Sequence, residues 1–246
     1  MSQLAITARR VLRWARHMRP VARIADRLPF RVEFRRPSRC IVHDADRVAY
    51  QRKHVDFDIR PGDRILDIGC GAYPFPGAAV SVDRFPGPTH HRHQPLKRDG
   101  TPFVVADVGA LPFPDGHFDY VYCSHVLEHV PDPIAACREI MRVGKRGYIE
   151  TPTLAKDMLF AWADGMHTWH VVSIGNTLCF FEYSSRQLKG IGSQAWSDEI
   201  FCRWWNPLQD AFDANQDLFN VMFQWSARFE VAVFDVKGGM RGLGPA

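Results

Sequence analysis

Three aspartates lie in or directly after short apolar runs that have the composition of buried strands. Asp67 lies within the first run, and Asp83 and Asp107 each follow a later one. Because the carboxyl ends of parallel strands meet at one edge of a sheet, we expect the three carboxylates to face one crevice. Asp83 can accept hydrogen bonds from both hydroxyls of a ribose, and Asp107 can accept one from an exocyclic amine. Asp67 can bind an ammonium group. A nucleotide-like ligand with a cationic amine has a partner for each of the three carboxylates.

Two glycines, Gly69 and Gly71, follow the first apolar run and are separated by Cys70. At such a pair the backbone turns sharply and leaves room for a ligand. A strand that runs into a glycine turn is typical of the ligand-binding corner of an open α/β sheet.

The elements that position these residues follow from apolar runs interrupted by glycine and proline. Strands are predicted over residues 65–68, 79–82, 103–106, 118–123 and 147–151, and helices over 44–54 and 133–143. Asp132 is the expected cap of the second helix, and Gly144 closes it. Two further strands, over 219–225 and 229–234, are predicted to form an antiparallel hairpin at the sheet edge. The alternation implies an α/β fold with a largely parallel sheet.

Size and composition narrow the class of protein. The 246 residues are 46% hydrophobic, which fits one α/β domain with additions or two small domains. The six cysteines form no CxxC pair, which favours a reducing cytoplasm over a zinc or disulfide framework. No apolar run reaches the roughly 18–20 residues of a membrane helix, and the N-terminus lacks the apolar core of a secretory signal.

The positive charge is concentrated near the N-terminus. Residues 1–60 hold 15 Arg and Lys against 6 Asp and Glu, a net +9, whereas the remainder holds 16 against 21, a net −5. Apolar residues recur at helical spacing over 4–18, with arginines on another face. Such a helix can bind an anionic membrane surface or nucleic acid, so peripheral membrane contact through residues 4–28 stays open. We favour a solvated arginine face.

Four segments between residues 60 and 152 resemble the ordered motifs of class I S-adenosylmethionine-dependent methyltransferases. They are Asp67-Ile-Gly-Cys-Gly71, Ser81-Val-Asp83, Ala106-Asp107 with Ala110-Leu-Pro-Phe-Pro-Asp-Gly116, and Phe118-Asp-Tyr-Val-Tyr-Cys-Ser-His-Val-Leu-Glu-His-Val-Pro-Asp-Pro133. The similarity is closest to the small-molecule subgroup. The strand end Gly147-Tyr-Ile-Glu-Thr-Pro152 resembles bacterial enzymes of polysaccharide or natural-product assembly.

The resemblance implies a Rossmann-like seven-stranded sheet with a reversed final strand, and S-adenosyl-L-methionine as cofactor. It assigns the methionine part of the cofactor to the glycines, the ribose to Asp83, the adenine amine to Asp107 and the ring to the Val108 backbone. Ser124 and His125 are expected near the methionine end. The complete expected cofactor set is Asp67, Gly69, Cys70, Gly71, Asp83, Arg84, Asp107, Val108, Ser124 and His125.

One departure from the family pattern concerns the segment after Gly71. The family continues to a third glycine and a helix, whereas here Ala72 and a Pro-Phe-Pro loop follow. Asp83 arrives only 16 residues after Asp67, so the first helix is expected to be short or missing. The cofactor would then be more exposed on that side, and a second subunit of a homo-oligomer is one way to cover it.

The resemblance divides the chain into three parts. Residues 1–58 are expected to form a basic helical extension, 59–237 a methyltransferase domain with an acceptor-side insert at about 153–215, and 238–246 a flexible tail.

Methyl transfer needs orientation and the removal of one proton from the acceptor. Candidate bases are His125, His129, His167, His170 and Glu150. We assign the catalytic role to His170, His167 and His125, and we interpret His129 as a structural residue. No metal site is predicted, because the run that contains His90, His91 and His93 lacks convergent acidic ligands.

The sequence therefore predicts a cytoplasmic methyltransferase that acts on a small molecule, most simply by O-methylation of a sugar, a glycan intermediate or a natural product. One alternative is a non-catalytic protein that binds S-adenosylmethionine and works through partners. Another is a protein or nucleic-acid methyltransferase. The net −5 outside the N-terminal region and the lack of an Asn/Asp-Pro-Pro-Tyr/Phe motif argue against nucleic acid as a partner.

Overall fold

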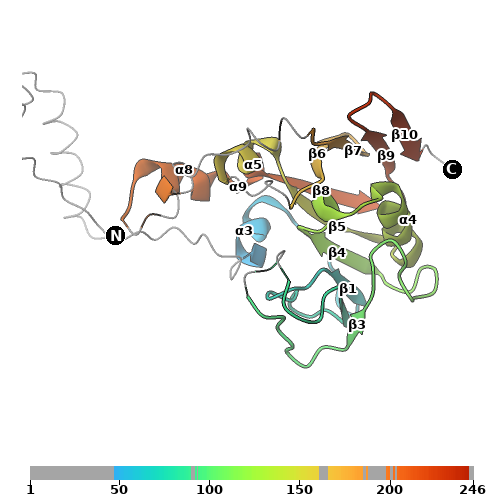
Figure 1. Cartoon of the computed structure of the whole chain (residues 1–246). Helices are drawn as coiled ribbons and strands as arrows, with labels where there is room; N and C mark the ends of the chain where they lie inside the picture. Colours follow the sequence, from blue (N-terminus) through green and yellow to red (C-terminus); the bar gives the residue numbers. More distant parts are fainter. Residues whose placement is uncertain are drawn as a thin grey trace, which may run out of the picture. The chain divides into compact units, whose positions relative to one another are not determined.

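A computed structural model describes most of the chain from Arg47 onward (Figure 1). The described residues are 47–89, 92, 94–160, 166–184, 187, 198–199, 202 and 204–243. The helix expected over 4–18, the membrane-contact segment 4–28 and the histidines at 90, 91 and 93 lie outside them. Within the described part, no helix has the length and apolar character needed to cross a membrane.

The central element is a six-stranded sheet in the order β3-β2-β1-β4-β5-β8 (Figure 1). Its strands are β1 (Ile65–Ile68), β2 (Val80–Asp83), β3 (Phe103–Val105), β4 (Tyr120–Ser124), β5 (Arg146–Pro152) and β8 (Asn220–Ser226). The first five are parallel, and β8 runs antiparallel to β5. The predicted α/β fold with a reversed final strand is confirmed, with six described strands in this sheet where seven were expected.

One face of the sheet is covered by aromatic side chains. Alternate residues of β1, β4 and β5 point to this face, where Tyr120, Tyr122 and Tyr148 are buried. Phe57 and Phe75 pack against these rings from outside the sheet. Phe75 lies in the short β1–β2 connection, which contains turns and no helix, as expected from its prolines.

The other face is covered by helix α4 (Pro133–Val143), which buries Ala136, Cys137, Ile140 and Val143. Asp132 caps this helix as predicted, because its carboxylate accepts from Ile134 N and Ala135 N at 3.0 and 3.2 Å. Gly144 follows as the C-cap. These apolar residues join Leu66, Ile68, Val121 and Cys123 in one core.

Helix α3 (Arg47–His54) begins the described chain, and Gln51 of this helix is fully buried. From the sequence alone, residues 47–57 are expected in the N-terminal extension. The burial of Gln51 and Phe57 shows that they belong to the core of the main domain.

A second sheet has the order β10-β9-β7-β6. Its strands are β6 (Trp169–Ile174), β7 (Thr177–Glu182), β9 (Glu230–Phe234) and β10 (Met240–Leu243). Between β7 and β8 lie helices α8 (Pro207–Ala214) and α9 (Gln216–Phe219), and α5 (Leu154–Phe160) precedes β6. The expected acceptor-side insert therefore shares a sheet with the C-terminal strands.

Two expectations for the C-terminal region are wrong in detail. Strands β8 and β9 exist, but they do not form a hairpin, because β8 pairs with β5 in one sheet and β9 with β7 in the other. Residues 240–243, which were placed in a frayed tail, pair with β9 as strand β10.

Candidate active site

A cavity of about 610 Å³ lies at the carboxyl ends of the parallel strands. It is bordered by the turns after β1, β2 and β4 and by the segment that leads into β6. Every residue of the expected cofactor set except Asp67 lines it: Gly69, Cys70, Gly71, Asp83, Arg84, Asp107, Val108, Ser124 and His125. Nine of the ten residues expected to bind the cofactor therefore line one cavity.

The glycine turn after β1 requires its glycines. Gly69 has φ +73°, and a Cβ there would lie 2.2 Å from Val126 Cγ2. Gly71 has φ +52° and would meet only the Arg92 side chain and the Gly69 carbonyl oxygen within 4 Å. Gly69 therefore allows close packing against the β4 turn, and Gly71 keeps the backbone open toward the cavity.

Asp83, at the end of β2, is largely buried and accepts three hydrogen bonds. Oδ2 accepts from Gly71 N at 3.1 Å and from Arg92 Nη1 at 3.3 Å, and Oδ1 accepts from Phe85 N at 2.8 Å. Arg92 also donates to the carbonyl oxygens of Phe85 and Gly87 at 3.1 and 2.8 Å. The guanidinium of Arg92 thus occupies one side of the carboxylate expected to bind a ribose.

Asp107 follows β3 and faces the same cavity. Its Oδ1 accepts from Gly109 N at 2.8 Å, and its Oδ2 lies 3.0 Å from Arg84 Nη1. Both side chains are more than a third exposed, so this ion pair is well solvated. Val108 is buried beside them and lines the cavity.

Asp67 does not face the cavity. Its side chain is 1% exposed and accepts from Phe75 N at 2.7 Å. Burial raises the pKa of this carboxyl to about 7, against the opposing effect of the Phe75 hydrogen bond. Asp67 therefore anchors the proline-containing loop after β1, and the structure does not place it where it could bind an ammonium group of a ligand.

Behind the cavity, a buried network surrounds Glu150 of β5. Oε1 accepts from Tyr50 OH and from Ser124 Oγ at 3.3 Å, and Oε2 accepts from Gln51 Nε2 at 2.9 Å and from Tyr148 OH. Burial opposes ionisation of this carboxyl, but His125 and other partners outweigh it, and the pKa falls to about 2. Glu150 is therefore an ionised anchor for His125.

His125 lies at the end of β4 with φ +56°, in the left-handed region that non-glycine residues rarely adopt. Its Nδ1 lies 3.3 Å from Glu128 Oε1 and its Nε2 lies 3.1 Å from Glu150 Oε1. Burial and Lys156 favour the neutral ring, but the two carboxylates outweigh them and raise the pKa of His125. The contacts with the two buried carboxylates hold the imidazole and offset the cost of the strained backbone at His125.

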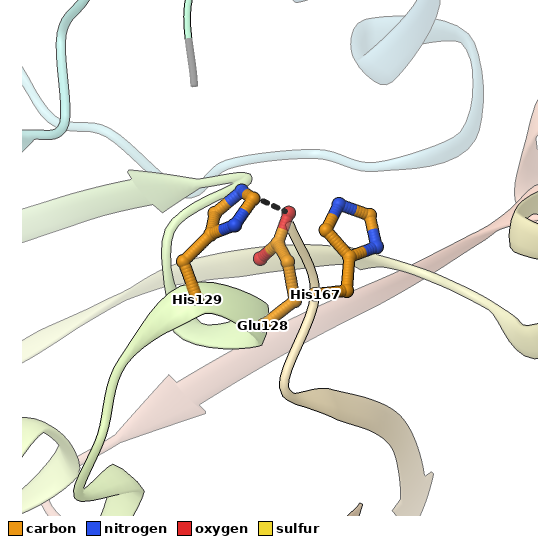
Figure 2. A group of neighbouring side chains, drawn as sticks. All are labelled: Glu128, His129 and His167. Carbon is orange, nitrogen blue, oxygen red and sulfur yellow. Dashed lines mark ion pairs between the residues drawn. The ribbon is translucent and has the colours of Figure 1, made fainter. Parts of the chain in front are cut away.

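Glu128, His129 and His167 lie close together in the lining of the cavity. Figure 2 shows the carboxylate of Glu128 between the two imidazole rings. His129 Nε2 lies 3.7 Å from Glu128 Oε1, and the two rings are 4.7 Å apart between centroids. One potential ligand atom from each residue lies within 4.8 Å of the others.

The segment that carries His167 is attached by hydrogen bonds to the short 3-10 helix η2 (Leu127–His129) and to Val130, the residue after it. Thr168 N donates to Glu128 O at 2.8 Å, and Trp169 Nε1 donates to Val130 O at 2.7 Å. This attachment explains how residues about forty positions apart form one cluster.

Of the predicted catalytic histidines, His125 and His167 line the cavity and His170 does not. In β6, Trp169 and Val171 are buried in the core, and strand alternation places His170 on the opposite face of the second sheet. Its ring stacks on Phe181 with a centroid distance of 4.9 Å. The structure therefore gives no support to His170 as the base.

Several residues of this region were not among the predicted site residues. They are Tyr50, Gln51, Arg92, Glu128, Lys156 and Met166, while His129 was considered as a base and interpreted as structural. Glu128 could have been noticed, because it is a carboxylate between two histidines, at His125 and His129, in an otherwise apolar stretch. Tyr50 and Gln51 lie far from the motifs in sequence, and only the packing of α3 brings them to Glu150.

Comparison with known proteins gives a consistent result over the same region. Residues 66–149 match the family model described as methyltransferase domain. Cycloartenol-C-24-methyltransferase 1 of Oryza sativa subsp. japonica is 37% identical over 105 residues, which cover 38% of this chain and 30% of that protein. The 27-O-demethylrifamycin SV methyltransferase of Amycolatopsis mediterranei is 31% identical over 101 residues, which cover 36% of this chain and 37% of that protein.

Among solved structures, the YcgJ protein of Bacillus subtilis has a TM-score of 0.37 at 22% identity and covers 51% of this chain and 61% of its own. The region that matches the methyltransferase-domain model, residues 66–149, contains all but the first residue of β1, strands β2 to β4, helix α4 and most of the cavity wall that carries Gly69, Asp83 and Asp107. The chain spans about a third of the length of the curated relatives it matches.

Proposed function

We propose that this protein transfers a methyl group from S-adenosylmethionine to an oxygen atom of a small-molecule acceptor. The observation that carries the proposal is the cavity that the described residues form at the carboxyl ends of the strands. It joins the glycine turn and the carboxylates Asp83 and Asp107 on one side to the cluster of Glu128, His129 and His167 on another. Its volume, about 610 Å³, lies in the range of small-molecule sites.

The residues present fit the cofactor. Gly71 leaves its side of the turn open, as a backbone in contact with a ligand requires. A carboxylate offers about four acceptor positions, and Asp83 already uses three. The two hydroxyls of a ribose therefore fit only after Arg92 releases Oδ2, whereas the Gly71 and Phe85 amides can stay in place.

S-adenosylmethionine, when bound, supplies a methyl group on a positively charged sulfur that an oxygen nucleophile can attack in line. The chain contributes orientation and a place for the acceptor proton. His129 Nδ1 lies 2.8 Å from Met166 O, and because a carbonyl oxygen only accepts, Nδ1 carries the proton. Burial lowers the pKa of His129, so the ring is neutral near pH 7 and Nε2 can accept.

We propose a sugar, a glycan intermediate or a natural product as the acceptor. The relatives named for cycloartenol and for demethylrifamycin act, by name, on small molecules, which supports this class over macromolecules. Figure 2 shows two imidazoles and a carboxylate side by side, a polar end suited to a hydroxyl.

The first test is calorimetric titration of the full chain with S-adenosylhomocysteine, followed by a screen of acceptors with radiolabelled S-adenosylmethionine. One-to-one binding and label transfer to a hydroxylated small molecule are expected. Absence of binding would remove the cofactor from the proposal. Binding without transfer to any of a broad set of small molecules would favour a protein that binds the cofactor and works through partners.

A further inference from the structure

We propose that Glu128, His129 and His167 form a binding site for one divalent transition-metal ion, with Zn²⁺ as its probe. Two imidazoles and one carboxylate are a ligand set typical of catalytic zinc and of non-haem iron. The three potential ligand atoms already lie within 4.8 Å of one another, and all three residues line the cavity, which gives an ion a path of entry.

Hydrogen bonds on the far side of each imidazole orient it toward the centre of the cluster. His129 Nδ1 lies 2.8 Å from Met166 O. His167 Nδ1 lies 3.0 and 3.1 Å from the two carboxylate oxygens of Asp157, which also accepts from Tyr183 OH at 2.7 Å. In both rings the proton is thereby assigned to Nδ1, and Nε2 keeps the lone pair that a metal needs. Such outer-shell bonds usually accompany metal-binding histidines.

The carboxylate of Glu128 supplies a second, independent observation. The side chain is 1% exposed, and its Oε2 has no hydrogen-bond partner among the described residues. A buried carboxylate oxygen without a donor is costly, because burial removes the water that would otherwise solvate it. A bound cation removes that cost, and Figure 2 places this carboxylate between the two rings where the ion would lie.

Small side-chain movements would close the site. Ligands at about 2.0–2.1 Å from a tetrahedral ion lie about 3.3 Å from one another. His129 Nε2 and Glu128 Oε1 are 3.7 Å apart, and no pair in the set exceeds 4.8 Å. The backbone needs no change, since Thr168 N is bonded to Glu128 O and holds the two segments together.

Three protein ligands leave at least one coordination position toward the cavity. With the ion bound, His129 Nε2 is a ligand and no longer accepts the acceptor's proton. A hydroxyl oxygen of the acceptor would then take the open position, where the ion would select oxygen-rich acceptors and lower the pKa of the hydroxyl, so that its proton passes to water. This role in the reaction rests on the proposed function, whereas binding of the ion does not.

The experiment uses untagged protein from which metal has been removed with a chelator. The protein is titrated with Zn²⁺ in competition with a chromophoric chelator. A second titration uses Co²⁺, whose binding is followed by its visible absorption. We expect one ion per chain and a Co²⁺ spectrum of four- or five-coordinate type. Glu128→Gln, a near-isosteric change, should weaken Zn²⁺ binding at least about 10-fold, as should His129→Ala and His167→Ala. Mg²⁺ should not compete, because it prefers oxygen ligands.

Two controls separate this site from other zinc-binding groups. The triple variant His90→Ala, His91→Ala and His93→Ala removes a histidine-rich run and should keep the ion, and His117→Ala should also keep it. The proposal is overturned if wild-type protein binds Zn²⁺ more weakly than about 100 µM. It is equally overturned if the triple variant loses the ion while Glu128→Gln keeps it.

S-adenosylhomocysteine titration of the same samples separates the two proposals. Zn²⁺ binding without cofactor binding would leave the metal site standing and contradict the methyltransferase proposal. If wild-type protein binds the cofactor and takes up no Zn²⁺, the metal site is contradicted and the methyltransferase proposal stands.

Discussion

Asp83 is the residue on which cofactor affinity should depend most directly. We predict that Asp83→Ala weakens binding of S-adenosylhomocysteine by about 10-fold or more, because charged hydrogen bonds are worth about 1.5–3 kcal/mol each. Calorimetry on the two proteins measures the change. Asp115→Ala removes an aspartate that is 83% exposed and outside the cavity, and it serves as the matched control. Equal affinity in Asp83→Ala and wild type would remove Asp83 from the ribose site.

Asp67 should make the stability of the fold depend on pH. Its pKa rises from 3.8 to about 7 on folding, mainly through burial, so the folded chain holds the proton more tightly than the unfolded chain. Protonation of Asp67 therefore contributes to the free energy of unfolding. The contribution, about 4 kcal/mol at most, is fully present below about pH 4 and is lost as the pH rises toward about 7.

Asp67→Asn carries no titratable group at this position and can still accept from Phe75 N. We therefore predict that the variant gains stability over wild type as pH rises from about 5 to about 7.5. Chemical unfolding at both pH values measures the difference. A constant difference between the two proteins would show that Asp67 is already ionised in the folded chain.

At the scale of elements, the turn from β1 is fixed by its contact with the turn from β4. Gly69→Ala adds a Cβ 2.2 Å from Val126 Cγ2 at a backbone φ of +73°. We predict a loss of about 2–4 kcal/mol in the free energy of unfolding. Gly77→Ala is the matched control, because Gly77 has φ +83° and no atom within 4 Å of the added Cβ.

The comparison of these two variants isolates the clash from the backbone strain. Adding Val126→Ala to Gly69→Ala removes the clashing methyl group. The double variant should therefore recover the difference in the free energy of unfolding between Gly69→Ala and Gly77→Ala. No recovery in the double variant would assign the whole effect to the backbone. Thermal and urea unfolding provide both measurements.

How well the sequence predicts an element depends on whether the element is determined locally. Strand β1 and helix α4 were predicted because an apolar run, or a cap with proline and glycine, encodes each within a few residues. The β6–β7 hairpin was missed, although Gly175-Asn176 between β-branched residues is a turn signal. The pairing of β9 with β7 could not be predicted, because no local feature selects among distant partner strands.

The same limit applies to the site. The glycine turn and two of the three aspartates were placed correctly because strand ends in a parallel sheet converge on one edge. Asp67 was misplaced because an aspartate that accepts from a buried amide, here Phe75 N, looks the same in sequence as an aspartate that faces a ligand. The contact of His167 with Glu128 depends on a hydrogen bond between two segments about forty residues apart, which spacing alone does not reveal.

At the scale of the whole molecule, one core joins both sheets. It contains Leu66 and Val121 from the first sheet and Phe180, Val231 and Val233 from the second. We predict that the full chain unfolds in a single calorimetric transition.

A chain that ends at Ser226 should lose this transition. Removal of Phe229, Val231 and Val233, each less than 5% exposed, forfeits roughly 5–9 kcal/mol of burial, which is comparable to the total stability of a domain. A chain that ends at Gly239 loses only β10, where Met240 is 69% exposed, and should still unfold cooperatively. Cooperative unfolding and cofactor binding by the shorter chain would show that the second sheet is accessory.

The path of the chain between the sheets has a consequence for how this region can change in evolution. The backbone leaves the first sheet after β5, forms β6 and β7 in the second, returns as β8, and crosses again to β9 and β10. No single cut releases the second sheet as a cassette, so exchange of this region between homologues by recombination would break pairings on both sides. This region should therefore change by point substitutions, because exchange of a whole module would disrupt strand pairing in both sheets.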